Sequence, residues 1–192
     1  MRPSRSGSFA LVALCLLVGG CGAAPPSSTS VTVTPTASAT ASPTRTPAAA
    51  PTSTREVDVQ HEPGEAALVS TVRFATHQGY DRVVIDLRGE MPGYTVKWVD
   101  ELVQDASGKP IHAKGGAYLQ VVLTPAQAHT DKGDPTWTGG PVFQANLGNV
   151  TDVVKTGDFE GRVGVGIVLD HRAPFRVLEQ RGPNRLVIDV AN

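Results

Sequence analysis

The stretch YDRVVIDL at residues 80–87 decides the fold class of this chain. Its apolar and polar side chains alternate, so Val83, Ile85 and Leu87 fall on one side and Arg82 and Asp86 on the other. Because successive side chains of a β-strand point to opposite faces, this alternation predicts a strand with one buried and one solvated face. We therefore expect Ile85 to lie in a core.

Short segments of the same kind, rich in valine and isoleucine, occur on both sides of this stretch. They cover residues 67–74, 93–99, 117–123, 162–169, 175–180 and 185–190, with turn residues at 88–92, 105–108 and 114–116. Helical patterns are scarce, and one short helical turn is expected at residues 125–129. Roughly eight strands joined by short turns predict an all-β fold, an antiparallel β-sandwich.

The sequence contains a weak internal echo. DRVVIDL at residues 81–87 corresponds by residue type to NRLVIDV at residues 184–190, so Ile188 is expected to be buried as Ile85 is. We expect Arg82 and Arg185 to pair with Asp86 or Asp189 rather than to bind a ligand. Two similar sheets that face each other would explain the echo, and so would the general likeness of strands of this composition.

The N-terminal 20 residues have the three-part order of a signal peptide. Arg2 and Arg5 form a basic start, residues 9–18 are an apolar run too short to span a bilayer, and small residues follow. The tetrapeptide VGGC at residues 18–21 resembles a bacterial lipobox. That resemblance implies a diacylglycerol on Cys21, which would become the mature N-terminus and anchor the chain to the membrane. The alternative is an ordinary signal peptide whose cleavage site contains a cysteine.

A stalk and one domain are expected after the signal peptide. Residues 21–56 are almost entirely Ala, Pro, Ser, Thr and Val after Cys21, and such a segment buries too little apolar surface to fold. They are predicted to form a disordered linker, either a spacer into the cell wall or a featureless tether. Residues 57–192 have the length and composition of a single domain.

Charge and cysteine content exclude several classes of protein. Loss of residues 1–20 would leave 15 basic and 18 acidic residues and no basic tract, which argues against nucleic acid and anionic lipid headgroups as partners. Cys15 would leave with the signal peptide, so the mature chain would hold no disulfide. The five histidines form no close-spaced ligand set, and no GxSxG elbow is present. We therefore expect no enzyme activity, no metal and no cofactor.

The most informative loop covers residues 129–140. It is polar, rich in turn residues, and contains Trp137 together with Asp131 and Asp134. An exposed tryptophan beside carboxylates can stack on a sugar ring and accept hydrogen bonds from its hydroxyls. These three residues are the candidate glycan-binding residues. In the alternative interpretation, Trp137 folds back and covers the edge of the sandwich.

Five segments together resemble the AMIN-like domain of actinobacterial lipoproteins. They are HQGYDRVVIDL at 77–87, PGYTV at 92–96, GDFEG at 157–161, PFRV at 174–177 and PNRLVIDV at 183–190. The resemblance covers about residues 66–191. It implies a β-sandwich related to the N-terminal domain of cell-wall amidases, which targets those enzymes to peptidoglycan or envelope partners. No catalytic amidase domain follows Asn192 in this sequence, so a non-catalytic role is expected.

The sequence therefore predicts a lipid-anchored, non-catalytic binding module on the outer face of the cell membrane. Its expected ligand is peptidoglycan or another wall glycan. The alternative is a scaffold lipoprotein that docks an envelope enzyme. An aromatic-lined groove would favour the glycan, and an exposed apolar patch or free sheet edge would favour a protein partner.

Overall fold

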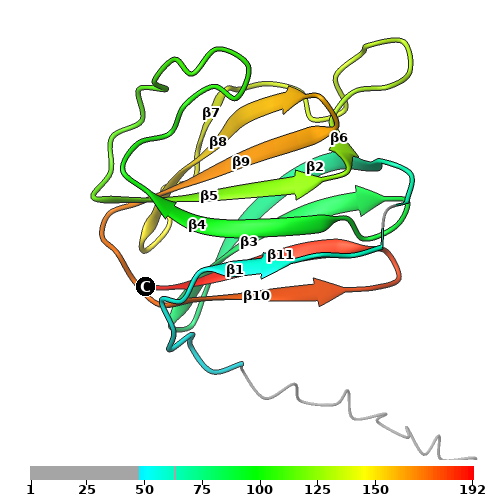
Figure 1. The fold of residues 1–192 in the computed structure, drawn as a ribbon. Helices are drawn as coiled ribbons and strands as arrows, with labels where there is room; N and C mark the ends of the chain where they lie inside the picture. Colours follow the sequence, from blue (N-terminus) through cyan, green and yellow to red (C-terminus); the bar gives the residue numbers. More distant parts are fainter. Residues whose placement is uncertain (1–47, 63) are drawn as a thin grey trace, which may run out of the picture. The chain divides into compact units, whose positions relative to one another are not determined.

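The computed structural model describes residues 48–62 and 64–192 (Figure 1). The predicted signal peptide, Cys21 and most of the predicted linker lie outside the described residues. The part of the chain that the structure describes contains no helix, and therefore none with the length and apolarity that a membrane crossing requires.

Two sheets pack face to face and form a β-sandwich (Figure 1). The six-stranded sheet has the order β1 (Val57–Val59), β4 (Gly93–Val99), β5 (Ala117–Thr124), β9 (Arg162–Leu169), β8 (Val150–Phe159) and β7 (Val142–Gln144). The five-stranded sheet has the order β10 (Phe175–Gln180), β11 (Arg185–Ala191), β3 (Tyr80–Arg88), β2 (Ala67–His77) and β6 (Ala126–Gln127). All neighbours are antiparallel except β2 and β6. The predicted all-β antiparallel sandwich is confirmed.

The strands differ from the prediction in three places. The described residues form eleven strands rather than roughly eight, because β1, β6 and β7 have only two or three residues and are too short to show alternation. The prediction of a short helical turn at residues 125–129 is wrong, since residues 126–127 form the short strand β6, which pairs with β2. Alternation also fails to mark β8, whose register shifts twice against β9 and so interrupts the two-residue period.

The core lies between the inner faces of the two sheets, where the alternation predicts it. Val83, Ile85 and Leu87 are buried, and the strand's opposite face carries Arg82 and Asp86. Ile188 on β11 is fully buried as well, so the expected burial of both echoed isoleucines is confirmed. The described domain contains no disulfide, and this apolar layer is the main source of its stability.

A loop closes the outer face of the six-stranded sheet. Residues 100–116 connect β4 to β5, and Leu102 from this loop packs with Val154 and Val168 in a second, smaller apolar cluster. Gly166 on β9 makes room for it, because a Cβ atom there would lie only 2.5 Å from Cδ1 of Leu102. Among the described residues, the outer face of the five-stranded sheet has no such cluster.

One buried carboxylate ties the two sheets together. Asp81 on β3 is fully buried and accepts hydrogen bonds from the backbone amides of Asn149 and Val150 at 2.6 and 2.9 Å. The side chains of Thr76 and Asn192 donate two more, at 2.7 and 2.8 Å. Burial alone would raise the pKa of Asp81, but these donors outweigh it and hold the pKa below its ordinary value. The carboxylate therefore stays charged and fixes the start of β8 against β3.

Candidate functional site

The two echoed strands lie side by side in the five-stranded sheet. β3 and β11 are antiparallel neighbours, and their register places Arg82 opposite Asp189 and Asp86 opposite Arg185. The repeated Arg and Asp positions therefore face each other across one pair of strands. The idea that DRVVIDL and NRLVIDV belong to two facing sheets is wrong.

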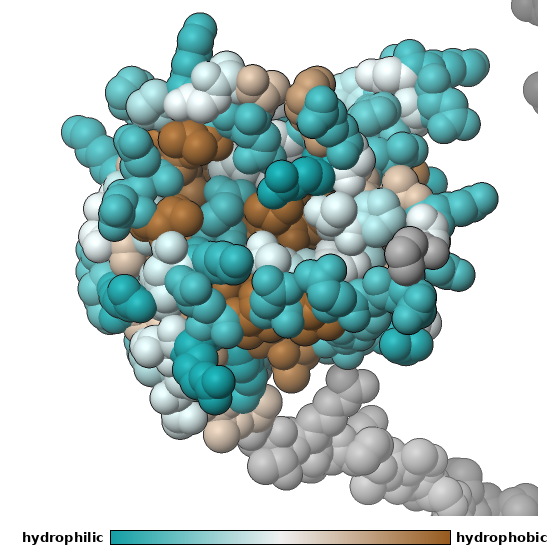
Figure 2. Space-filling view, in the orientation of Figure 1, coloured by the Kyte–Doolittle hydropathy of each residue, from teal (hydrophilic) through white to brown (hydrophobic). Residues whose placement is uncertain are grey.

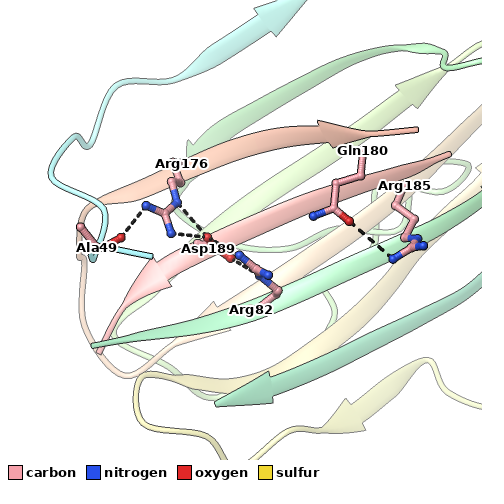
Figure 3. A network of polar contacts seen from close by, with 6 residues as sticks. All are labelled: Ala49, Arg82, Arg176, Gln180, Arg185 and Asp189. Atoms are coloured by element: carbon pink, nitrogen blue, oxygen red, sulfur yellow. Dashed lines mark hydrogen bonds and ion pairs between the residues drawn. The ribbon is translucent and has the colours of Figure 1, made fainter. Parts of the chain in front are cut away.

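The first group of charges centres on Asp189, which is fully buried (Figure 3). Arg82 holds it with two hydrogen bonds, from Nε at 2.6 Å and Nη2 at 2.9 Å, and these bonds raise the pKa of Arg82 against the opposing effect of burial. Arg176 on β10 donates from Nε at 2.8 Å. Its Nη2 lies 2.7 Å from the same carboxylate, at an angle that makes this contact an ion pair rather than a hydrogen bond.

Aromatic rings stiffen this group. The guanidinium carbons of Arg82 and Arg176 lie 5.3 and 5.1 Å from the ring centroid of Tyr80, within the range of a cation–π contact. His77 stacks on the same ring at 4.9 Å. The two arginines are thus held in place before any ligand binds.

The second group of charges centres on Asp86. Arg73 on β2 holds it with two hydrogen bonds of 2.5 and 2.8 Å, which raise the pKa of Arg73. Arg185 is held more loosely, because its Nε lies 3.8 Å from Asp86 and its Nη1 lies 3.5 Å from Oε1 of Gln180 (Figure 3). The Nε of Arg185 has no hydrogen-bond partner among the described residues. The expected pairings are confirmed, with Arg82 on Asp189 and Arg185 beside Asp86.

The two groups form one surface, which we call the arginine face. It consists of four arginines and two aspartates on β2, β3, β10 and β11, and so has a surplus of two positive charges: Arg73, Arg82, Arg176, Arg185, Asp86 and Asp189. Leu178, 38% exposed, lies on the same side of the sheet. Guanidinium groups bind carboxylates and phosphates in a two-pronged geometry, so this surface suits an anionic ligand.

The predicted glycan-binding loop has a different structure from a stacking site. Trp137 is only 4% exposed and stacks on Phe143 at 5.1 Å, and Nζ of Lys155 donates to its carbonyl oxygen at 3.2 Å. Asp131 and Asp134 are exposed on the loop. The structure does not bring the three residues together on one surface, and the burial of the ring fits the alternative interpretation, in which it covers the sandwich edge.

Two arginines of the arginine face were missed by reasoning from the sequence. Arg73 and Arg176 lie in predicted strands at positions that alternate with inward-facing residues, so their outward direction could be read. What the sequence does not show is the register that brings them to Asp86 and Asp189. Both contacts span 13 residues, but Arg176 lies directly opposite Asp189, whereas Arg73 lies opposite Val84 and reaches Asp86 diagonally.

The described domain is thus a β-sandwich with one outer face covered by a loop and the other carrying the arginine face. The sequence profile of the AMIN-like domain matches residues 67–192, so the chain belongs to the AMIN-like domain family. This family consists of non-catalytic binding and targeting modules associated with the cell wall. Searches of the curated proteins and of the solved structures found no match.

Proposed function

We propose that this protein is a lipid-anchored envelope module that binds peptidoglycan through its arginine face. The observation that supports this is the surplus of two guanidinium groups on the arginine face, in a chain whose 17 basic and 18 acidic residues give a net charge of −1. Peptidoglycan has carboxylates on its stem peptides, and these are the groups that arginine binds best. Figure 2 shows apolar side chains as separate patches among hydrophilic ones on the side of the molecule that it presents.

The arginine face is tested by removing the cation that holds the fold least. Arg185→Gln should weaken co-sedimentation with purified insoluble peptidoglycan by about tenfold or more, which corresponds to about 1.4 kcal/mol. The stability of this variant should change little, because the nearest partners of the Arg185 side chain, Gln180 and Asp86, lie at 3.5 and 3.8 Å. Denaturant titration of the same variant would measure that stability.

Lys97→Gln provides the matched control. Lys97 is an exposed cation on the other sheet, also loosely paired, at 3.8 Å from Asp58. It should bind peptidoglycan as the unaltered chain does. Equal loss of peptidoglycan binding in both variants would show that binding depends on total charge. Unchanged peptidoglycan binding in Arg185→Gln would remove the arginine face from the proposal.

The anchor is proposed on the lipobox-like residues 18–21. Cys21→Ser should abolish lipid attachment, because no other cysteine remains after removal of residues 1–20. Two acyl chains or more give stable membrane attachment, so the variant should shift from the membrane fraction to the medium or remain unprocessed. Mass spectrometry of the native N-terminus checks this directly, and an unmodified Cys21 would contradict it.

A second function, docking of an envelope enzyme, is supported by one observation. β10 ends the five-stranded sheet, and a strand in that position offers free backbone groups to a partner strand. Its first residue is already occupied, since the amide of Phe175 donates to the carbonyl of Ser53 at 2.7 Å. Val177→Pro, which blocks strand addition within β10, would abolish enzyme docking but leave peptidoglycan binding unchanged.

A further inference from the structure

The hairpin between β8 and β9 presents an aromatic side chain to solvent. Phe159, the last residue of β8, is 52% exposed and pairs with Arg162 across the turn. The two turn residues, Glu160 and Gly161, both have positive φ angles, of 50° and 71°. This is the backbone of a tight two-residue hairpin, and glutamate adopts it only at a conformational cost. The turn therefore fixes the backbone position of Phe159 at the end of the hairpin.

Two hollows flank Phe159, of about 280 and 360 Å³. Gln104 and Ala106, from the loop that covers this sheet, line both of them. The first hollow also contains the polar side chains of Asp105 and Arg162, and the second those of Ser107 and Lys155. An exposed ring between a mainly polar hollow and a mainly apolar one is suited to a small ligand with an apolar face and a polar rim.

Asp105 and Arg162 are free to bind a ligand in the first hollow. The Asp105 side chain lies against Gly157 and Gly164, where a Cβ atom would collide with its carboxylate. Burial raises the pKa of Asp105, and Arg162 opposes that rise. Among the described residues, none donates a hydrogen bond to this carboxylate and none forms an ion pair with Arg162. The hollow thus offers one acceptor and one donor.

The charges around Phe159 exclude a strongly anionic ligand. Three carboxylates and two cations lie in the hollows, so the surface lacks the positive surplus of the arginine face: Asp105, Asp158, Glu160, Lys155 and Arg162. Asp158 is already engaged, since it accepts hydrogen bonds from the backbone amide of Ala128 at 3.0 Å and pairs with His129 at 2.7 Å. These contacts tie the hairpin to the base of the loop that carries Asp131 and Asp134.

We propose that Phe159 is the platform of a sugar subsite for an uncharged pyranose ring of a wall glycan. The ring stacks its C–H face on Phe159, Asp105 accepts a hydrogen bond from one hydroxyl, and Arg162 donates to another oxygen. This subsite is separate from the arginine face, which lies on the other sheet. The two sites would bind different parts of one polymer, the glycan strand here and the carboxylates there.

The test is a titration of the full chain with chitotetraose, an uncharged chain of four N-acetylglucosamine units. Binding is monitored through the NMR chemical shifts of the protein. Shifts are expected at residues 104–107 and 157–162. Phe159→Leu should weaken binding by about tenfold, because it keeps apolar bulk but removes the flat ring. Phe159→Tyr should retain binding. Val142→Ala, at another exposed apolar position on the same sheet, 37% exposed, serves as the control and should bind as the unaltered chain does.

The outcomes separate this inference from the peptidoglycan proposal. Arg185→Gln should bind chitotetraose normally, whatever its effect on peptidoglycan. Absence of shifts around Phe159, or equal binding by Phe159→Leu and the unaltered chain, would overturn the sugar subsite and leave the arginine face standing. Chemical-shift changes confined to the arginine face would also overturn the sugar subsite. A denaturation midpoint unchanged in Phe159→Leu would show that its effect on binding is local.

Discussion

Replacement of Trp137 with alanine is expected to lower the free energy of unfolding by about 3–5 kcal/mol, the usual cost of truncating a buried aromatic residue. The ring is 4% exposed, and it stacks on Phe143 and lies 5.8 Å below the ammonium group of Lys155. Truncation would leave a cavity beside Phe143 of β7, which is only three residues long. Denaturant unfolding followed by circular dichroism gives the change in free energy directly.

Asp131→Ala and Asp134→Ala are the controls for Trp137→Ala. Both aspartates are exposed in the same loop, so each change should alter stability by less than about 0.5 kcal/mol. Peptidoglycan binding per folded molecule should be preserved in Trp137→Ala at a temperature where it remains folded. Unchanged stability together with lost binding would restore Trp137 as a ligand contact and contradict the position of the ring described above.

The contrast between Ile85 and Trp137 shows what sequence reasoning can reach. The inward direction of Ile85 follows from alternation within eight residues, because side-chain direction in a strand depends only on position along that strand. Trp137 lies in a polar, turn-rich segment, and its burial depends on Phe143 and Lys155 together with the bond from Thr136 to the carbonyl of Val69, 67 residues away. No local pattern encodes such a contact.

The arginine face falls between these two cases. Its outward residues were predictable from alternation, but Arg82 and Asp189 are 107 residues apart, and which strands pair is decided by the whole sheet. The echo between residues 81–87 and 184–190 was a signal of this pairing. When two strands with the order Arg, then Asp run antiparallel, each arginine meets the aspartate of the other strand, so the repeated order favours the observed register.

Glycine spacing was a further signal that alternation alone did not use. In β9, Gly164 and Gly166 alternate with inward-facing valine and isoleucine, so both glycines lie on the outer face. A glycine inside a strand often marks a place where another segment comes close to the backbone. Here Asp105 and Leu102 from the covering loop occupy those places. The glycines indicated that this face is covered, although they did not indicate which loop covers it.

Asp189→Asn is expected to cost about 3–5 kcal/mol of stability, the range measured when one member of a buried ion pair is removed. Asparagine keeps the size of the side chain, so the loss reports the charge. Asp189 is fully buried, and its removal leaves the side chains of Arg82 and Arg176, which are 22% and 27% exposed, without a counter-charge. Chemical denaturation at neutral pH measures the loss.

Asp86→Asn is the matched control because the sheet register makes it the counterpart of Asp189. The Asp86 side chain is 17% exposed, and Arg73, which holds it, is 56% exposed, so water can compensate for the lost pair. The free energy of unfolding should therefore fall clearly less in Asp86→Asn than in Asp189→Asn.

Arg176→Gln added to Asp189→Asn should recover part of the stability lost in Asp189→Asn, since one of the two unpaired cations is gone. Equal costs at Asp86 and Asp189, or no recovery in the double variant, would show that charge compensation does not hold the arginine face in place. The recovery matters for function too, because a ligand carboxylate seated on that face would compete with Asp189 for the same two guanidinium groups.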